Sequence, residues 1–190
     1  MIDSIFIERD VLDHPVSQKV INRLKNADVF EIERYQEMFN RRQQNFRIQK
    51  QKPALILAKK YDNFVLPAPS GFGIDAQKNY YFSHMYNCIY DCRYCFLQGM
   101  YSSANYVLFV NYEDFFKEIT DVIAENTNDS ITFFSGYDCD SLAFEKITGF
   151  AEQAVEFFSN FNSVELELRT KSIVSDTLLK RSPISNCIVA

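Results

Sequence analysis

The sequence lacks several features that mark particular classes of protein. It contains no Trp, so its aromatic residues are 18 Phe and 11 Tyr. No apolar run approaches the roughly 18 residues that a membrane-spanning helix needs. The first ten residues lack the basic and apolar regions of a signal peptide, so none is predicted. Internal repeats and low-complexity tracts are also absent, which excludes repeat and low-complexity proteins.

The five cysteines are poorly suited to a disulfide framework. Their number is odd, and three of them lie within eight residues, at Cys88, Cys92 and Cys95. Free thiols persist in reducing compartments. We therefore expect a cytoplasmic protein.

The overall charge argues against a protein that coats nucleic acid. The net charge is −5, while 47% hydrophobic and 24% charged residues are typical of an ordinary folded domain. Residues 41–60 are an exception, because they hold seven cations and no acid: Arg41, Arg42, Arg47, Lys50, Lys52, Lys59 and Lys60. Such a run either contacts phosphates or forms the solvated face of a surface helix.

Hydrophobic patterning divides the chain into two regions. Residues 1–75 are predicted to form a small α+β region that carries the basic run, with strands near 2–7 and 28–33 and a helix after His14. Two Pro and two Gly within 67–73 are typical of a boundary.

Residues 76–190 show alternating strands and helices, which predict a parallel sheet covered by helices. Strands are expected near 80–85, 106–110, 131–134, 164–168 and 187–190, and helices near 111–123, 141–158 and 173–179. About four strand–helix units are too few to close a barrel, and the chain stops inside an apolar strand. We therefore expect an α/β fold with an incomplete parallel (β/α) barrel, and a chain truncated at its C-terminus.

The strongest chemical signal is the C-x3-C-x2-C spacing of Cys88, Cys92 and Cys95. Four cysteines occupy every position of a tetrahedral metal or an iron–sulfur cluster. Three thiolates instead leave one iron of a [4Fe–4S] cluster open to a small chelating ligand. The alternative is a zinc site completed by His84 or a distant ligand, although zinc pairs are usually C-x2-C or C-x4-C.

Two polar segments, residues 135–141 and 169–172, follow predicted strands. Ligands bind at the carboxyl ends of parallel strands, so we expect both segments near a ligand. Gly136 allows the backbone to approach it closely. Cys139 lies in a loop, which fits a reactive thiol better than a packing one. Lys171 either neutralises a carboxylate or is an ordinary solvated lysine.

The run Cys-Ile-Tyr-Asp-Cys-Arg-Tyr-Cys-Phe-Leu-Gln-Gly, residues 88–99, resembles the cluster loop of the spore photoproduct lyase family of radical S-adenosylmethionine (AdoMet) enzymes. The motifs Cys-Asp-Ser at 139–141 and Leu-Arg-Thr-Lys at 168–171 fall where that family has matching motifs. The resemblance implies a partial barrel of the radical AdoMet type and a [4Fe–4S] cluster held by the three clustered cysteines. It further implies AdoMet contacts from Tyr94, Ser141 and Lys171, and a hydrogen atom returned by Cys139 to a product thymine radical.

The resemblance also implies an activity. Family enzymes cleave AdoMet reductively to a 5′-deoxyadenosyl radical and repair a UV-induced thymine dimer in DNA. The implied partners are damaged DNA and an external one-electron donor such as flavodoxin or ferredoxin, with no membrane partner. Because the chain is expected to be truncated, we expect weak or no turnover from these 190 residues.

One residue departs from the family pattern. Family lyases place a second tyrosine directly after the third cluster cysteine, where it relays a hydrogen atom, but this chain has Phe96. Either Tyr101 or Tyr137 substitutes for it, or the substrate is instead RNA, a peptide or a small molecule. A zinc-stabilised binding module is the non-enzymatic alternative.

Overall fold

The computed structural model describes residues 2–73 and 76–190, and the chain forms two compact units. The first unit joins the residues up to Lys60 with His84–Asn111, and the second joins Tyr61–Ser83 with Tyr112–Ala190. Each unit contains a five-stranded, mostly parallel sheet, which confirms the predicted α/β class. The boundary predicted at residue 75 lies outside the described residues.

The sheet of the first unit has the strand order β2-β1-β3-β7-β6. The first four strands are parallel, and β6 is antiparallel to β7. The bounds are β1 Ser4–Glu8, β2 Asp28–Ile32, β3 Leu55–Ala58, β6 Met85–Tyr86 and β7 Tyr106–Phe109. Every residue of β3 and β7 is buried, as expected for parallel strands covered on both faces. The sequence pattern placed β7 with the second region, whereas in the structure it pairs with β3.

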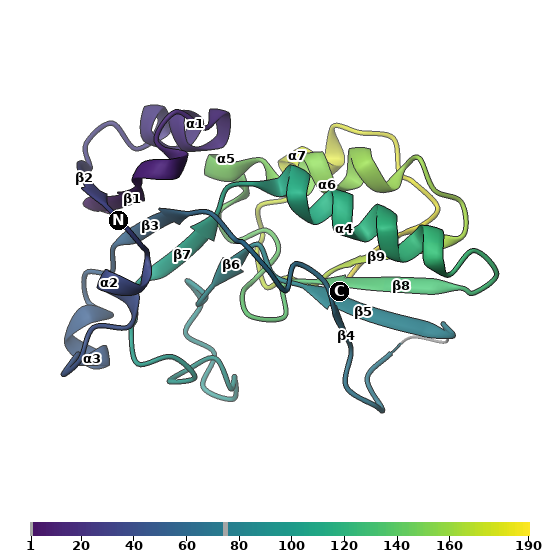
Figure 1. Cartoon of the computed structure of the whole chain (residues 1–190), viewed down its shortest axis with the longest axis horizontal. Helices are drawn as coiled ribbons and strands as arrows, with labels where there is room; N and C mark the ends of the chain where they lie inside the picture. Colours follow the sequence, from purple (N-terminus) through teal and green to yellow (C-terminus); the bar gives the residue numbers. More distant parts are fainter. Residues whose placement is uncertain (1, 74–75) are drawn as a thin grey trace. The chain divides into compact units, whose positions relative to one another are not determined.

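Helices lie on both sides of this sheet. They are η1 Arg9–Val11, α1 Pro15–Arg23, α2 Gln36–Phe39 and α3 Phe46–Gln49. The side chain of His14 accepts a hydrogen bond from the Val16 backbone N–H, and Pro15 occupies the first helical position, so α1 begins where the sequence predicts. Figure 1 shows α1 on one side of β1 and β3, with α2 and α3 on the other.

A buried carboxylate fixes the carboxyl ends of β1 and β3. Glu8 has no exposed surface, and its two oxygens accept hydrogen bonds from the backbone N–H groups of Tyr35 (2.7 Å) and Lys59 (2.8 Å). These bonds satisfy a buried charge that would otherwise be costly. They also fix the position of the chain that enters α2.

The sheet of the second unit has the order β10-β9-β8-β5-β4, and only β4 is antiparallel to its neighbour. The strands are β4 Leu66–Pro67, β5 Lys78–Phe82, β8 Ile131–Ser135, β9 Val164–Leu168 and β10 Cys187–Val189. The helices are α4 Tyr112–Glu125, α5 Glu145–Thr148, α6 Phe150–Phe158 and α7 Asp176–Leu179. Among the described residues this sheet has two free edges, so the predicted incomplete barrel is confirmed.

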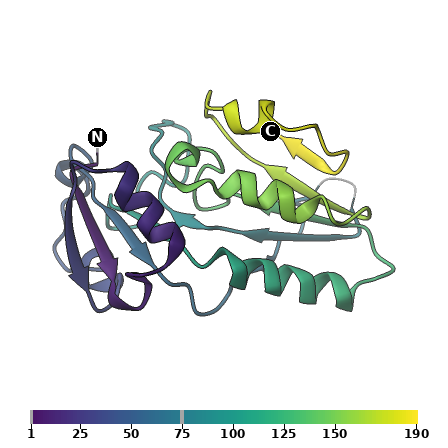
Figure 2. The same cartoon turned by 90° about the horizontal axis from the view of Figure 1, so that it is seen from above.

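The helices α4 and α6 cover one face of this sheet (Figures 1 and 2). Phe133 of β8 points to that face and contacts Phe158 of α6, with ring centroids 5.7 Å apart. Because side chains alternate along a strand, Phe134 and its register partner Tyr81 point to the opposite face. That opposite face carries the pocket described below.

The single helix predicted over 141–158 is instead two helices separated at Gly149. This glycine has φ +67°, a left-handed conformation that ends α5. The buried Glu145 carboxylate accepts hydrogen bonds from the backbone N–H groups of Ala151 (2.8 Å) and Glu152 (3.2 Å). It thereby satisfies donors in the first turn of α6. None of the helices in the described ranges is long and apolar enough to cross a bilayer.

We predict that His84 makes the protein less stable in mild acid. This residue is 2% exposed, and burial lowers its pKa to about 3. The unfolded chain therefore binds a proton near pH 6.5 that the folded chain does not bind, so stability falls as the pH decreases. Between pH 7.5 and 5, the loss from this residue should be about 2 kcal/mol. Urea unfolding of the wild type and of His84→Gln at several pH values measures it.

The other histidine provides the control. His14→Asn retains a side chain that can cap α1 and leaves His84 in place, so this variant should still lose the stability attributed to His84. A His84→Gln variant that loses as much stability as the wild type over this range would contradict the prediction.

Candidate functional site

The three clustered cysteines lie on one loop of the first unit, immediately after β6. All three are free thiols and half-buried. The Cys95 backbone N–H donates to the Cys92 carbonyl (2.9 Å), and the Tyr90 backbone N–H donates to Cys88 Sγ (3.4 Å). Three free thiols on one short loop are a suitable donor set for an iron–sulfur cluster. In the described part of the chain, no three Cys, His, Asp or Glu side chains gather in metal-binding geometry.

The buried side chain of Asn87 closes the base of this loop. Its amide donates to the carbonyls of Ser103 (2.8 Å) and Asn105 (2.7 Å), which lie beyond the other end of the loop. Asn87 has φ +66°, a left-handed conformation that asparagine tolerates better than most residues. The residue before Cys88 is therefore held by its own side chain.

The end of α3 is attached to the same loop. Lys50 Nζ donates to Asp91 Oδ1 (2.5 Å) and to Gln98 Oε1, and the Gln98 amide donates to the Tyr90 carbonyl (3.0 Å). Gln49 Oε1 accepts from the Ser103 hydroxyl and from the Ala104 backbone N–H. The basic run thus supports the cysteine loop through Lys50. The sequence analysis did not predict this role, because no local pattern other than the charge of Lys50 indicates it.

The middle of the loop faces solvent. Tyr94, which the resemblance assigns to AdoMet, is 82% exposed, and Phe96 is 59% exposed. Leu97 is buried and anchors the C-terminal side of the loop. Tyr101, one of the two proposed substitutes for the missing tyrosine, packs against Phe39 with ring centroids 5.1 Å apart.

A second group of predicted residues lies in the second unit, after β8 and β9. The hydroxyls of Ser135 and Ser141 are 2.9 Å apart and hydrogen-bonded. Gly136 has φ +79°, and a Cβ there would lie 2.6 Å from Ser141 Oγ. No other residue fits at position 136 without displacing Ser141, so the glycine is required by the packing of Ser141.

The carboxylate of Asp140 joins the two strand ends. One oxygen accepts from the Leu142 backbone N–H (2.9 Å) and the Thr170 hydroxyl (2.8 Å), and the other accepts from the Lys171 backbone N–H (2.5 Å). The Ser141 backbone N–H donates to the Arg169 carbonyl (3.0 Å).

These hydrogen bonds bring together the three residues of this unit that the sequence analysis predicts to belong to the functional site. Cys139 and Ser141 are buried beside Asp140, while the Lys171 side chain is exposed. Sequence reasoning quoted Asp140 as part of a motif but assigned it no role.

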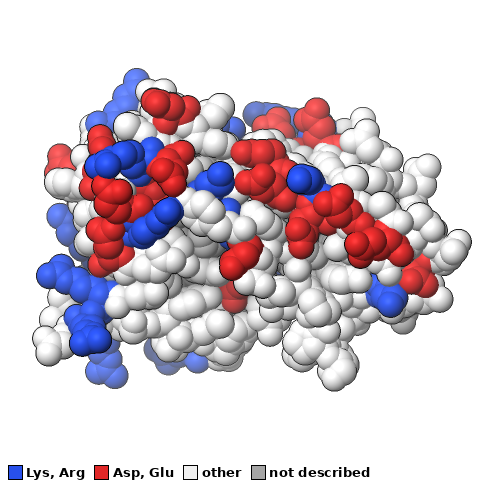
Figure 3. All heavy atoms as spheres, in the orientation of Figure 1, with Lys and Arg blue, Asp and Glu red and all other residues white. Residues whose placement is uncertain are grey.

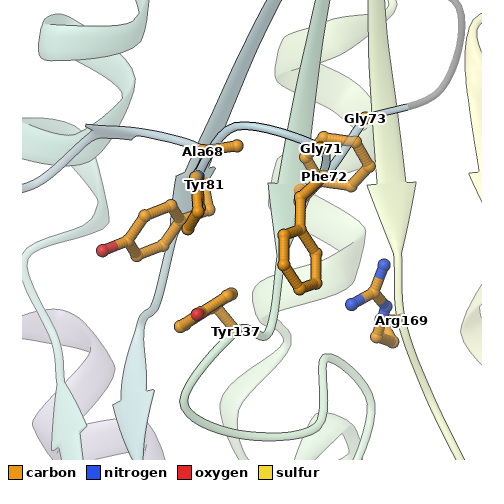
Figure 4. A pocket seen from close by; sticks show the side chains of 9 residues that line it. Ala68, Gly71, Phe72, Gly73, Tyr81, Tyr137 and Arg169 are labelled. Carbon is orange, nitrogen blue, oxygen red and sulfur yellow. The ribbon is translucent and has the colours of Figure 1, made fainter.

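A pocket of about 210 Å³ opens on the face of this sheet away from α4 and α6. Its walls come from the segment after β4, from β5 and β8, and from the residues after β8 and β9: Ala68, Pro69, Gly71, Phe72, Gly73, Tyr81, Phe134, Tyr137 and Arg169. Figure 4 shows the aromatic rings of Phe72, Tyr81 and Tyr137 around the space, with the guanidinium of Arg169 at one side. The pocket is therefore aromatic with one cation.

Buried polar contacts orient the pocket residues. Arg169 donates from Nε (2.8 Å) and pairs through a terminal nitrogen (2.7 Å) with the buried Glu167 carboxylate, and its guanidinium lies 5.9 Å from the Phe134 ring centroid. Tyr81 and Tyr137 have ring centroids 4.3 Å apart. Burial raises the pKa of Tyr81, and the charge of Asp138 raises it further, so this hydroxyl stays protonated at neutral pH.

We predict that Lys50→Ala exposes the cysteine thiols. The change removes two charge-assisted hydrogen bonds to the loop, and a loss of about 1.4 kcal/mol of local stability would speed alkylation about tenfold where local opening limits the rate. Iodoacetamide labelling, followed by peptide mass spectrometry at Cys88, Cys92 and Cys95, measures this rate.

The matched control is Lys52→Ala, which removes a charge two residues away that pairs with Asp3 at 3.0 Å and is 74% exposed. Its labelling rate should equal that of the wild type. Equal rates in all three proteins would show that Lys50 does not hold the loop.

Comparisons with known proteins identify relatives of the chain. A family model described as spore photoproduct lyase matches residues 1–185. No curated protein matches the sequence. Similar solved structures include a cysteine-to-serine variant of spore photoproduct lyase (TM-score 0.84, 16% identity) and a double variant with bound AdoMet and dinucleoside spore photoproduct (TM-score 0.79, 18% identity). A tyrosine-to-phenylalanine variant is also similar, with a TM-score of 0.79 and 17% identity.

Each of these similarities covers 100% of this chain and 55% of the solved chain. The chain therefore spans about half the length of those lyases and shares the fold of that half. Because the family model covers residues 1–185, nearly the whole sequence, the chain belongs to the spore photoproduct lyase family.

Proposed function

We propose that this protein acts as a radical AdoMet lyase that repairs UV-damaged thymine dimers in DNA. One observation carries the proposal: a chain of the spore photoproduct lyase family presents Cys88, Cys92 and Cys95 as free thiols on a single loop. In this proposal the three thiolates hold a [4Fe–4S] cluster. When bound, the cluster supplies the electron for reductive cleavage of AdoMet.

The residues around Asp140 would bind and orient AdoMet. The Ser141 hydroxyl, held by Ser135, offers a polar contact, and Gly136 allows that hydroxyl to take its position because it has no Cβ. Lys171 keeps its backbone fixed by Asp140 while its ammonium group remains exposed and available to a carboxylate. On the cysteine loop, Tyr94 presents an exposed ring for a further contact. Solved relatives of the chain include a structure with bound AdoMet.

Cys139 would act as the hydrogen-atom donor to the product. Its S–H bond breaks as a C–H bond forms on the thymine radical, and the transfer is favourable because the S–H bond is weaker. The thiol is 6% exposed, so bulk water has little access to it. Burial of this kind protects a radical intermediate from side reactions.

The aromatic pocket lined by Tyr137, two residues before Cys139, suits a planar heterocycle. Aromatic rings and an arginine face are the groups on which nucleobases stack, at about 1–3 kcal/mol per base. AdoMet and dinucleoside spore photoproduct, which solved lyases bind, both contain such rings. A lesion inside duplex DNA would have to leave the base stack to reach a pocket of this kind.

The proposal includes a cellular setting. An external one-electron donor such as flavodoxin or ferredoxin would reduce the cluster. All five cysteines are free thiols, which supports the reducing environment of the cytoplasm.

A second candidate keeps the radical chemistry but changes the substrate to RNA, a peptide or a small molecule. The observation that favours it is Phe96, which has no hydroxyl to relay a hydrogen atom. Of the two possible substitutes, Tyr101 packs among aromatic rings in the first unit, whereas Tyr137 lines the pocket and is two residues from Cys139. Tyr137 is therefore the better candidate for a relay.

The proposed function predicts that the chain binds a cluster that senses AdoMet. Anaerobic reconstitution with iron and sulfide should give an iron–sulfur absorbance band and, after reduction, an electron paramagnetic resonance signal that AdoMet perturbs. Replacing the three clustered cysteines with alanine should abolish both signals. Metal analysis that finds one zinc and no iron or sulfide in the folded protein would contradict the proposal and establish the zinc-binding alternative.

The proposed role of Cys139 predicts a change in products rather than in cofactor cleavage. Under conditions in which the wild type turns over, Cys139→Ala should still cleave AdoMet, but it should convert dinucleoside spore photoproduct into off-pathway thymine products, because no thiol quenches the product radical. Liquid chromatography with mass spectrometry measures both yields. Cys187→Ala, which changes a half-buried cysteine in β10, should keep the wild-type products. A wild-type product distribution from Cys139→Ala would rule out this role.

A further inference from the structure

Four arginines near the cysteine loop have no charged or polar partner among the described residues. Arg41, Arg42 and Arg47 lie between the end of α2 and the end of α3, and Arg93 lies in the cysteine loop. All four are exposed. Within the described residues none of their side chains forms an ion pair, hydrogen bond or ring contact. We call these four residues the arginine surface.

The other arginines of the chain differ in this respect. Arg9 pairs with Glu33 (2.8 Å), Arg34 with Asp10 (3.3 Å), Arg169 with Glu167 and Arg181 with Glu156, and Arg23 also has a partner. Acidic side chains thus pair with four of the nine guanidinium groups in this acidic protein. The arginine surface is the exception, and its charge faces solvent.

The lysines of the same basic run are already engaged. Lys50 holds the cysteine loop, Lys52 pairs with Asp3, and Lys60 lies 4.9 Å from the Phe109 ring centroid. Lys50 also neutralises Asp91, an acid of the cysteine loop. The uncompensated charge of the run therefore belongs to its arginines. Figure 3 shows Lys and Arg side chains gathered at the α2–α3 end of the first unit, with no acidic side chains among them.

The hydrogen bonds of α3 place this charge beside the cysteine loop. Arg47 belongs to α3, whose last residue, Gln49, binds the Ala104 backbone N–H, while the next residue, Lys50, binds Asp91 and Gln98. Arg93 lies between Asp91 and Gln98 in sequence. A polyanion bound to the arginine surface would therefore run past the predicted cluster ligands.

We propose that the arginine surface binds the phosphate backbone of DNA and holds the strand next to the cysteine loop. Guanidinium groups suit this role because they bind phosphate through two parallel hydrogen bonds and remain charged at any physiological pH. A net charge of −5 repels nucleic acid elsewhere, so a local patch would also orient the strand. The choice of DNA over other polyanions rests on the proposed function.

Salt dependence of DNA binding tests this proposal. Fluorescence anisotropy with labelled thymine-rich duplex and single-stranded DNA, between about 50 and 200 mM salt, gives the slope of log K against log salt concentration. In the triple variant Arg41→Gln, Arg42→Gln, Arg47→Gln, the slope should become shallower by about 0.9 per lost phosphate contact on duplex DNA and about 0.7 on a single strand. Arg93→Gln should add a further step of similar size.

A control variant removes the same charge from another part of the first unit. Lys19→Gln, Arg23→Gln, Lys25→Gln alters α1 and the residues after it, which Figure 1 shows on the other side of β1 and β3. This variant should keep the wild-type slope. Circular dichroism and thermal unfolding should show that both variants fold like the wild type, since the three arginines are exposed and none of the three control residues is buried.

Several results would overturn the proposal. They are undetectable binding by the wild type at about 50 mM salt, an unchanged slope in the arginine variant, and an equal change in the control. Tighter binding of RNA than of DNA of the same sequence would reject the DNA assignment. The assay uses the chain without cluster or AdoMet. Failed reconstitution would therefore refute the proposed function but would leave the DNA-binding role of the arginine surface untouched. An intact cluster with an unchanged slope would refute only the arginine surface.

Discussion

The arrangement of the second unit's site depends on the carboxylate of Asp140. A buried carboxylate must receive hydrogen bonds from the protein, and here the donors are the Leu142 and Lys171 backbone N–H groups and the Thr170 hydroxyl. Because these donors lie after two adjacent parallel strands, satisfying one charge fixes two loops against each other. The neighbours of Asp140 in sequence, Cys139 and Ser141, are positioned by the same bonds. A residue with no proposed chemical step thus determines where Cys139 and Ser141, which have proposed roles, lie.

The first unit uses a related arrangement with a different result. Asn87 and Lys50 supply hydrogen bonds to the cysteine loop on either side of Tyr94, to Asp91 before it and to Gln98, Ser103 and Asn105 after it. The centre of the loop carries the exposed Tyr94, and the thiols remain half-buried. A loop fixed on both sides of an exposed centre can admit the bulky inorganic group of the proposed function, whereas the burial of Cys139 fits its proposed role as a hydrogen-atom donor.

Local patterns in the sequence predicted the elements but not their long-range partners. Apolar periodicity was sufficient for α1, α4, β8 and β9, because burial of one helical stripe or of a whole strand leaves a direct trace in sequence. The same pattern shows that β7 is buried but not that it pairs with β3, and apolar spacing alone does not show the break at Gly149. The bonds of Lys50 to Asp91 and of Asp140 to Thr170 span 41 and 30 residues. Such contacts follow from the fold and have no local signature, which is why the cysteine motif was found and its supports were not.

The phenylalanine at position 96 affects the chemistry of the cysteine loop more than its folding. Replacing a buried tyrosine with phenylalanine leaves a hydrogen-bond partner unsatisfied and lowers stability. At a position that is 59% exposed, water satisfies the hydroxyl, so its loss costs little stability and the ring keeps its contacts. The difference from the family pattern therefore acts on what the loop can do rather than on whether it forms. It leaves the fold of the cysteine loop intact. In the proposed function, a relay of hydrogen atoms would then need another hydroxyl, for which the pocket offers Tyr137 beside Tyr81.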